Sequence, residues 1–187
     1  MMEYLDLVDE KGNPTGEIVS RNAAHREGLL HRTAHVWIVR ECDGRTQILL
    51  QKRSMKKESF PGLFDTSSAG HIPSGSDPIE SALRELLEEL GIETTEEQLS
   101  FVGFFRIRYE KKFHGKLFRD NEVTWVYVYH DPVEIGSLSL QKDEVEEVQW
   151  FNLDDVAEEI QVSRERFCVP SQSLQLLKSF LKGENTL

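Results

Sequence analysis

The chain has 187 residues, of which 39% are hydrophobic and 29% are charged, as expected for a soluble globular protein of one domain. Its formal net charge of −11 argues against broad nucleic-acid binding, which needs an excess of Lys and Arg. No apolar run approaches the roughly 18 residues that span a membrane, and the N-terminal segment does not have the pattern of a secretory signal. We therefore expect a cytoplasmic protein without a membrane partner, with Cys42 and Cys168 reduced.

Strand patterns dominate the chain. Alternating and β-branched runs predict strands at residues 3–9, 16–21, 34–40, 46–53, 99–109, 122–130 and 144–153. The basic segment 106–119 overlaps the end of one of these runs, and we interpret it as mostly loop. Helical periodicity predicts helices at 78–90, near 153–160 and at 171–181. Because helices and strands do not alternate strictly, we expect an α/β fold in which helices cover a mixed sheet, with one domain over residues 1–187.

The helix predicted at 78–90 has recognisable ends. Asp77 is a good N-cap, Glu80 has the spacing of a capping box with it, and Gly91 stands where a glycine ends a helix. The apolar residues that recur every three or four positions predict one buried stripe, made of Ile79, Leu83, Leu86 and Leu90.

Three glutamates of this helix lie on a neighbouring face. Glu85, Glu88 and Glu89 are spaced i, i+3 and i+4, so their side chains gather, and Arg84 is placed to pair with Glu88. A solvated acidic face is one interpretation. The glycine-rich turn before the helix favours another, because it permits close backbone approach beside the carboxylates. A divalent cation such as Mg²⁺ would relieve their repulsion and attract a diphosphate.

The stretch from Gly70 to Ile92 resembles the Nudix box, in which a glycine is followed by a glutamate and then by the Arg-Glu and Glu-Glu pairs. This resemblance implies a Nudix α/β/α sandwich and a hydrolase of diphosphates that uses Mg²⁺ or Mn²⁺. It implies that Glu85, Glu88 and Glu89 bind the metal with the Gly70 carbonyl, and that Arg84 orients the glutamates. Ser76 departs from the pattern, since it stands where the family has its first glutamate. We expect that Ser76 caps the helix and leaves metal binding in place.

Segments outside the box resemble one branch of that superfamily, the type I isopentenyl-diphosphate isomerases. These segments include "AAHREGLLHR", "FPGLFDTSSAGH" and "DEVEEVQWFNL". The isomerase reaction needs a cysteine immediately before the Gly-His pair, and this position holds Ala69. A methyl group neither donates nor accepts a proton. Because Glu85 and Glu88 are present as well, we expect a hydrolase with an isomerase-like frame.

The same branch points to a second group of residues. His25, His31 and His71, with Asp120 and Glu122, match positions that surround a second divalent metal in the isomerases. Such donors suit Mn²⁺ or Zn²⁺. The spacing of six residues between the first two histidines departs by one residue from the isomerase pattern, and Asp120 is shorter than the matching glutamate. Two interpretations therefore stay open, a metal site or histidines that bond within loops and line a substrate pocket.

The expected reaction is in-line attack of water on a diphosphate linkage in a nucleoside diphosphate derivative or a similar small organic diphosphate. Glu85 or Glu122 is the expected base. The expected substrate ligands are Lys52, Arg53, Lys57 and His71. An active isomerase and a non-catalytic nucleotide-binding sensor are the alternatives. A homodimer is compatible with the family, and the loops near 108–119 and after Val162 are expected to recognise the leaving group.

Overall fold

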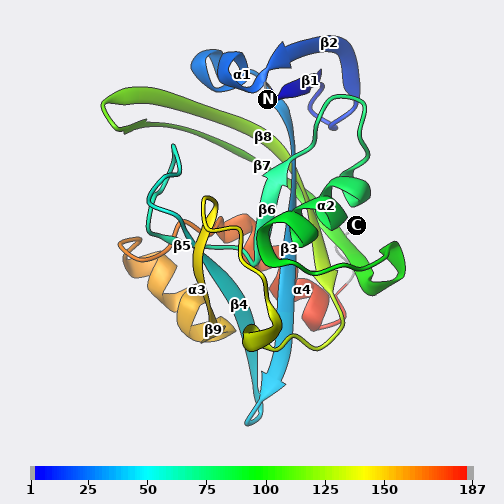
Figure 1. Ribbon diagram of the computed structural model, residues 1–187, viewed down its shortest axis with the longest axis vertical. Coiled ribbons are helices and arrows are strands. Elements are labelled where there is room, and N and C mark those ends of the chain that lie inside the picture. The colour runs from blue at the N-terminus through cyan, green and yellow to red at the C-terminus, as the bar shows by residue number, and fades with distance from the viewer. Residues whose placement is uncertain (1–2, 185–187) are drawn as a thin grey trace.

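The computed structural model describes residues 3–184 and consists of a mixed β-sheet covered by helices (Figure 1). The strands follow the order β5–β4–β3–β8–β7, while β6 pairs with β3 and β9 with β4. Their bounds are β3 His31–Cys42, β4 Arg45–Arg53, β5 Phe64–Asp65, β6 Ser68–His71, β7 Leu99–Phe113, β8 Lys116–Tyr129 and β9 Val145–Asn152. The pair β3–β8 is parallel and the other pairs are antiparallel. This arrangement confirms the predicted α/β sandwich with a mixed sheet.

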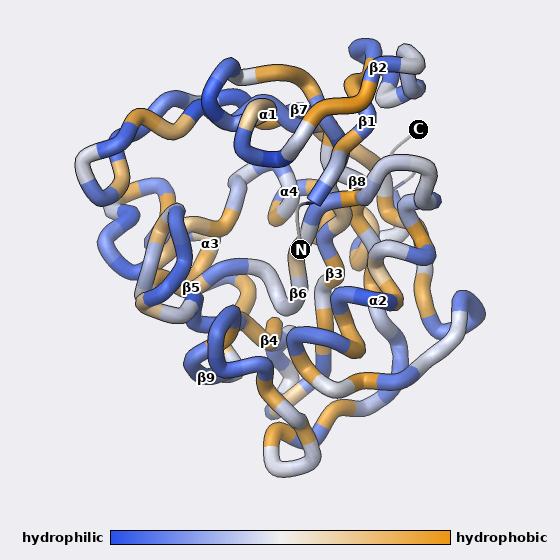
Figure 2. Tube along the Cα trace, turned by 45° about the horizontal axis from the view of Figure 1, so that its top comes forward, coloured by the Kyte–Doolittle hydropathy of each residue, from blue (hydrophilic) through white to orange (hydrophobic). Residues whose placement is uncertain are grey.

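Strand β3 separates two hydrophobic cores. Its first eight residues, His31 to Ile38, are all buried, as expected for a strand covered on both faces. On one face, Trp37 packs with residues of α3 (Leu153–Val162) and α4 (Ser171–Leu181). On the other, Val36 and Ile38 pack with residues of α2 (Pro78–Leu90). In Figure 2, orange apolar stretches alternate with blue polar ones along the chain around β3, β4 and α2.

A small N-terminal unit lies over one end of the sheet. Strands β1 (Tyr4–Val8) and β2 (Pro14–Ser20) form the predicted hairpin as a separate two-stranded sheet. Helix α1 (Arg21–Glu27) follows, and it was not predicted from the sequence. Ser20 caps it by accepting a hydrogen bond from the Ala23 amide, and Gly28 ends it in the left-handed conformation.

The basic segment 106–119 is not mostly loop, and this prediction is wrong. Strands β7 and β8 continue as one long hairpin that projects from the sheet, and we call residues 106–121 the arm (Figure 1). Its turn is His114-Gly115, where both residues have positive φ, as two-residue hairpin turns require. Charged residues alternate with Ile107 and Tyr109 from Arg106 to Glu110, so the high charge of the segment hid a strand period.

Helix α2 spans Pro78–Leu90, as the sequence predicted, and Gly91 ends it with φ of 72°. The predicted capping box is absent, because the Asp77 side chain makes no capping hydrogen bond. The Asp77 carbonyl instead accepts from the Ser81 hydroxyl at 2.9 Å. The other two predicted helices are present as α3 and α4. Two short 3₁₀ helices lie at Glu96–Gln98 and Ile135–Ser137. Within residues 3–184, no helix is long and apolar enough to cross a membrane.

Candidate active site

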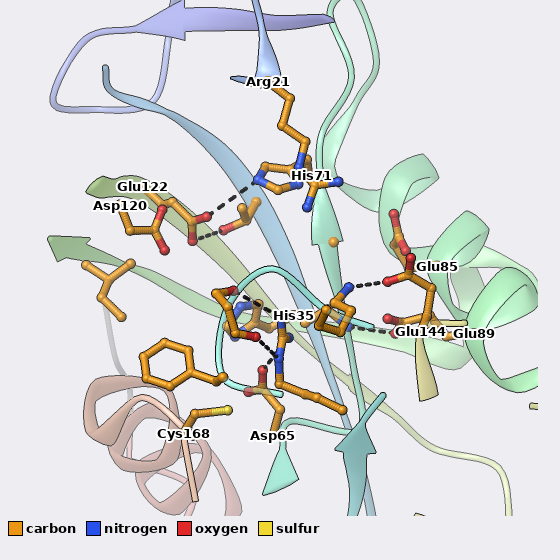
Figure 3. A pocket seen from close by; sticks show the side chains of 18 of the residues that line it. Arg21, His35, Asp65, His71, Glu85, Glu89, Asp120, Glu122, Glu144 and Cys168 are labelled. Carbon is orange, nitrogen blue, oxygen red and sulfur yellow. Dashed lines mark hydrogen bonds and ion pairs between the residues drawn. The ribbon is translucent and has the colours of Figure 1, made fainter. Parts of the chain in front are cut away.

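A polar cavity of about 280 Å³ lies where β6, α2 and the base of the arm meet. We call it the central pocket. Most of the predicted site residues line it, namely Arg53, Lys57, Gly70, His71, Arg84, Glu85, Glu88, Glu89 and Glu122. Figure 3 shows Glu85 and Glu89 on one side of the pocket and His71, Asp120 and Glu122 on another.

Gly70 is required by the close approach of helix α2. A Cβ atom at this position would lie 2.1 Å from the carboxylate carbon of Glu85. Gly70 lies on β6, which pairs with the buried strand β3, so the backbone has little room to withdraw. Any side chain would therefore displace Glu85. The sequence prediction that Gly70 and Glu85 belong to one site is consistent with this geometry.

Glu89 is the most deeply buried of the three glutamates, with 3% of its surface exposed. Its Oε2 accepts hydrogen bonds from the Ser68 hydroxyl at 2.7 Å, the Ala69 amide at 3.0 Å and the Gln51 side chain at 3.0 Å. Burial raises the pKa of Glu89 even though these donors oppose the shift. The hydrogen bonds therefore fix the orientation of a carboxylate whose charge is incompletely balanced.

Arg84 braces the acidic cluster as predicted. Its guanidinium lies 2.7 Å from Glu85 and 3.1 Å from Glu88, and it donates to the His71 carbonyl at 3.0 Å. Burial and the neighbouring charge of Glu89 nevertheless raise the pKa of Glu85 to about 8. One guanidinium therefore does not balance the negative charge of this face.

These features fit a divalent cation. The partly buried Glu85 and the buried Glu89 have raised pKa values and lie on consecutive turns of one helix, where they form an oxygen-rich site with excess negative charge. Glu88 lies at the rim, with its side chain half exposed. Oxygen ligands of this kind match Mg²⁺ or Mn²⁺, with Glu85, Glu88, Glu89 and the Gly70 carbonyl as candidate ligands.

Cationic side chains surround the same pocket. Arg53 donates to Asp65 at 3.0 Å and to the Ser59 carbonyl at 3.0 Å, and Lys57 pairs with Glu144. Each cation already has a partner, so binding of a phosphate would add to or replace these contacts.

The structure does not bring Lys52 to the pocket. Its ammonium pairs with Glu146 and Glu147, because it points to the opposite face of β4 from Gln51 and Arg53. Arg21 and Glu144 line the pocket although the sequence prediction did not include them. Arg21 pairs with Glu3 at 3.2 Å, and its Nε is buried without a hydrogen-bond partner among the described residues.

Three histidines converge beside the acidic face of α2, from α1, β3 and β6. The Nε2 atoms of His25 and His71 are 3.1 Å apart, and the rings of His31 and His71 stack with centroids 5.3 Å apart. Burial lowers the pKa of His25 to about 4, and burial also holds the pKa of His71 well below its usual value. The imidazoles of His25 and His71 are therefore neutral at pH 7 and available as ligands.

Two carboxylates complete this histidine cluster. Asp120 lies 3.6 Å from His25, and Glu122 lies 3.5 Å from His31 and 3.8 Å from His71. Within the described residues, His25 Nδ1, His31 Nε2 and Asp120 Oδ1 are buried without hydrogen-bond partners. Mixed nitrogen and oxygen donors left unpaired in this way suit a transition metal better than loop bonding. The departure of one residue in the histidine spacing is therefore accommodated, because α1 places His25 against His71.

Ser76 has no capping role in this structure, and a carboxylate from another element supports its loop. Asp6 of β1 accepts from the Ser74 hydroxyl at 2.6 Å and from the Gly75 amide at 3.0 Å. The buried Arg32 guanidinium joins them, since it donates to Asp6 at 3.1 Å and to the Ser76 carbonyl at 3.1 Å. Asp6 and Arg32 thereby fix the loop that precedes helix α2.

Comparison with known proteins agrees with this geometry. The NUDIX domain family model matches residues 29–169. An uncharacterized Nudix hydrolase of Clostridium acetobutylicum is 38% identical over 155 residues, which cover 83% of this chain and 72% of that protein. An isopentenyl-diphosphate Delta-isomerase of Citrobacter koseri is 32% identical over 155 residues, covering 82% and 80%. A crystal structure from Deinococcus radiodurans superposes with a TM-score of 0.68 at 20% identity, covering 94% of this chain and 98% of that one.

Proposed function

We propose that this chain, which belongs to the Nudix family and is a Nudix-type hydrolase, cleaves the diphosphate linkage of a nucleoside diphosphate derivative or a similar small organic diphosphate. The observation that carries the proposal is the pair formed by the partly buried Glu85 and the buried Glu89 beside the Gly70 backbone, facing a pocket edged by Arg53 and Lys57. The acidic residues can bind a cation, and the basic residues can bind phosphate. Together they suit an anionic substrate that is held through a metal ion.

Glu85, Glu88 and Glu89 would hold Mg²⁺ or Mn²⁺ together with the Gly70 carbonyl. Such an ion supplies charge neutralisation at phosphate and activation of water. The hydrogen bonds to Glu89 orient its carboxylate before substrate arrives, and Arg84 keeps Glu85 and Glu88 in register. This order reduces reorganisation during the reaction.

Arg53, Lys57 and Arg21 would bind the phosphate oxygens, and His71 would contact them from the opposite wall. Attack of water forms one P–O bond, the bridging P–O bond breaks, and the leaving phosphate departs with the bridging oxygen. Glu85 would accept the proton of the water, because a bound cation would favour its ionised form although the pKa of Glu85 in the ion-free site is raised to about 8. Glu122 is the second candidate base, and its contacts with His31 and His71 favour its ionised form.

The test is a panel of nucleoside diphosphates, nucleoside triphosphates, nucleotide sugars, dinucleotides and prenyl diphosphates, assayed for phosphate-bearing products with and without Mg²⁺. Hydrolysis of at least one compound that stops with chelator and returns with Mg²⁺ supports the proposal. A non-catalytic sensor would bind a member of the panel without turnover. Metal-independent products, or none from the whole panel, would contradict the proposal.

An isomerase is the second candidate, favoured by the convergence of the histidine cluster and by the similarity to isopentenyl-diphosphate isomerases. Ala69 argues against it, because this residue of β6 lines the pocket with a methyl group where the reaction needs a proton donor or acceptor. Isopentenyl diphosphate incubated with the protein should give no dimethylallyl diphosphate. Enzyme-dependent conversion would establish the isomerase instead.

A further inference from the structure

A second cavity, of about 340 Å³, adjoins the central pocket, and we call it the side groove. It lies between strand β7 of the arm and residues 164–172, the segment that leads into helix α4. The two cavities share five lining residues, namely Phe60, Ile107, Tyr109, Cys168 and Pro170. A molecule bound through its diphosphate in the central pocket can therefore continue into the side groove.

The floor of the side groove is apolar and partly aromatic. Leu63, Ile107 and Phe167 line it, together with the rings of Phe60 and Tyr109, whose centroids are 5.5 Å apart. Flat side chains at the passage between the cavities suit a flat group, which can stack on them over a large area. Besides its charged residues, the lining offers a sugar the Tyr109 hydroxyl and the side chains of Ser171 and Gln172, so the apolar floor favours a flat group over a strongly hydroxylated one.

The rim of the side groove is positively charged. Arg108, Lys111 and Arg164 line it, and the acidic residue of the lining, Glu110, already pairs with Arg119 at 3.3 Å. Arg108 has no hydrogen bond or ion pair from its side chain within residues 3–184, and the Lys111 ammonium lies 4.8 Å from the Phe60 ring centre. In a chain of net charge −11, these cations create a local site for an anion.

We propose that the side groove binds the organic half of the substrate, and that this half combines a flat ring system with an additional phosphate or carboxylate group. The inference rests on the proposed diphosphate hydrolysis, which places the reacting phosphates in the central pocket. The flat group lies against Phe60 and Tyr109, and the additional anion lies at the rim that Arg108, Lys111 and Arg164 line. The chemical class is therefore a diphosphate diester with a third negatively charged site, rather than a prenyl diphosphate or a neutral nucleotide sugar.

Two pairs of compounds test this proposal, because each pair shares one diphosphate and differs by one phosphomonoester. The pairs are coenzyme A with dephospho-coenzyme A, and NADP⁺ with NAD⁺. We expect kcat/KM in Mg²⁺ to be about tenfold higher for the phosphorylated member of at least one pair. The double variant Arg108→Gln/Lys111→Gln should reduce that ratio to near one, through a lower kcat/KM for the phosphorylated member.

The control is the double variant Lys112→Gln/Lys116→Gln, which removes the same charge from the arm at residues that line neither cavity. It should keep the wild-type ratio. Equal kcat/KM within both pairs, or loss of the preference in the control as well, would overturn the proposal while leaving diphosphate hydrolysis intact. If none of the four compounds is cleaved, their affinities are measured by calorimetry with Ca²⁺ in place of Mg²⁺. The ratio of affinities within each pair, in wild type and in both double variants, then decides between the same outcomes.

Discussion

Replacing Glu85 by Gln is expected to stabilise the protein in the absence of metal. Burial and the charge of Glu89 raise the pKa of Glu85 from its ordinary 4.5 to about 8. Ionisation of Glu85 is therefore less favourable in the folded than in the unfolded state. The protonated Glu85 side chain therefore contributes stability that is fully present below pH 4.5. This contribution to the free energy of unfolding is lost as the pH rises through about 8. At about 1.4 kcal/mol per pH unit, the loss at pH 9 has an upper bound of roughly 5 kcal/mol.

Thermal unfolding of EDTA-treated wild type and Glu85→Gln at pH 5, 7 and 9 measures this effect. A glutamine cannot ionise, so the Tm of the variant should exceed that of wild type by about 5–10 °C at pH 9 and match it more closely at pH 5. Mg²⁺ should raise the Tm of wild type and not that of the variant. Glu88→Gln is the matched control, because this side chain is half exposed. Equal Tm values at pH 9, or the same gain in Glu88→Gln, would refute the reasoning.

Three further predictions concern neighbouring residues. Glu89→Gln should lower kcat at saturating Mg²⁺ by at least ~10²-fold, or about 2.7 kcal/mol of barrier, with an unchanged circular dichroism spectrum; wild-type kcat would contradict its role. Elemental analysis of protein grown with Mn²⁺ or Zn²⁺ should find a bound transition metal that His25→Ala and His71→Ala lose. Because the pKa of His25 is lowered to about 4, the metal occupancy of wild type should fall only as the pH approaches 4. Equal metal content in wild type and both variants would refute the site. Asp6→Asn should raise the Mg²⁺ concentration needed for half-maximal activity. Adding Ser76→Glu, which places a carboxylate near Arg32, should partly restore the wild-type value. An unchanged Mg²⁺ requirement in Asp6→Asn would show that the loop does not need the support of Asp6.

Local signals predicted helix α2 and its acidic face. The helix spans Pro78–Leu90 as expected, because an apolar stripe and a terminal glycine act within the helix itself. The pairing of Arg84 with Glu88 followed from the same spacing. The position of Lys52 was also available in the sequence, since alternation along a predicted strand places it opposite Arg53. The charge of Lys52 was given more weight than its position in the strand.

Other features depend on contacts between distant segments. The histidine cluster needs α1, β3 and β6 to meet, and no spacing in the sequence shows that His25 lies against His71. The same holds for Glu144, whose place in the pocket depends on its pair with Lys57. The arm was missed for another reason, because the alternation of charged with apolar side chains from Arg106 to Glu110 gives way to two consecutive lysines, Lys111 and Lys112.

The support of the Ser76 loop by Asp6 affects how sequence change in this protein should be interpreted. A motif search confined to residues 70–92 registers a defect at Ser76, although the folded chain supplies a carboxylate from strand β1. A shortened or altered N-terminal hairpin would remove that carboxylate while leaving every residue of the box in place. The resulting loss of activity would resemble the effect of a catalytic mutation, although the change lies some seventy positions before Ser76 in the sequence. In this lineage, residues 6, 32 and 76 are therefore expected to vary together rather than independently.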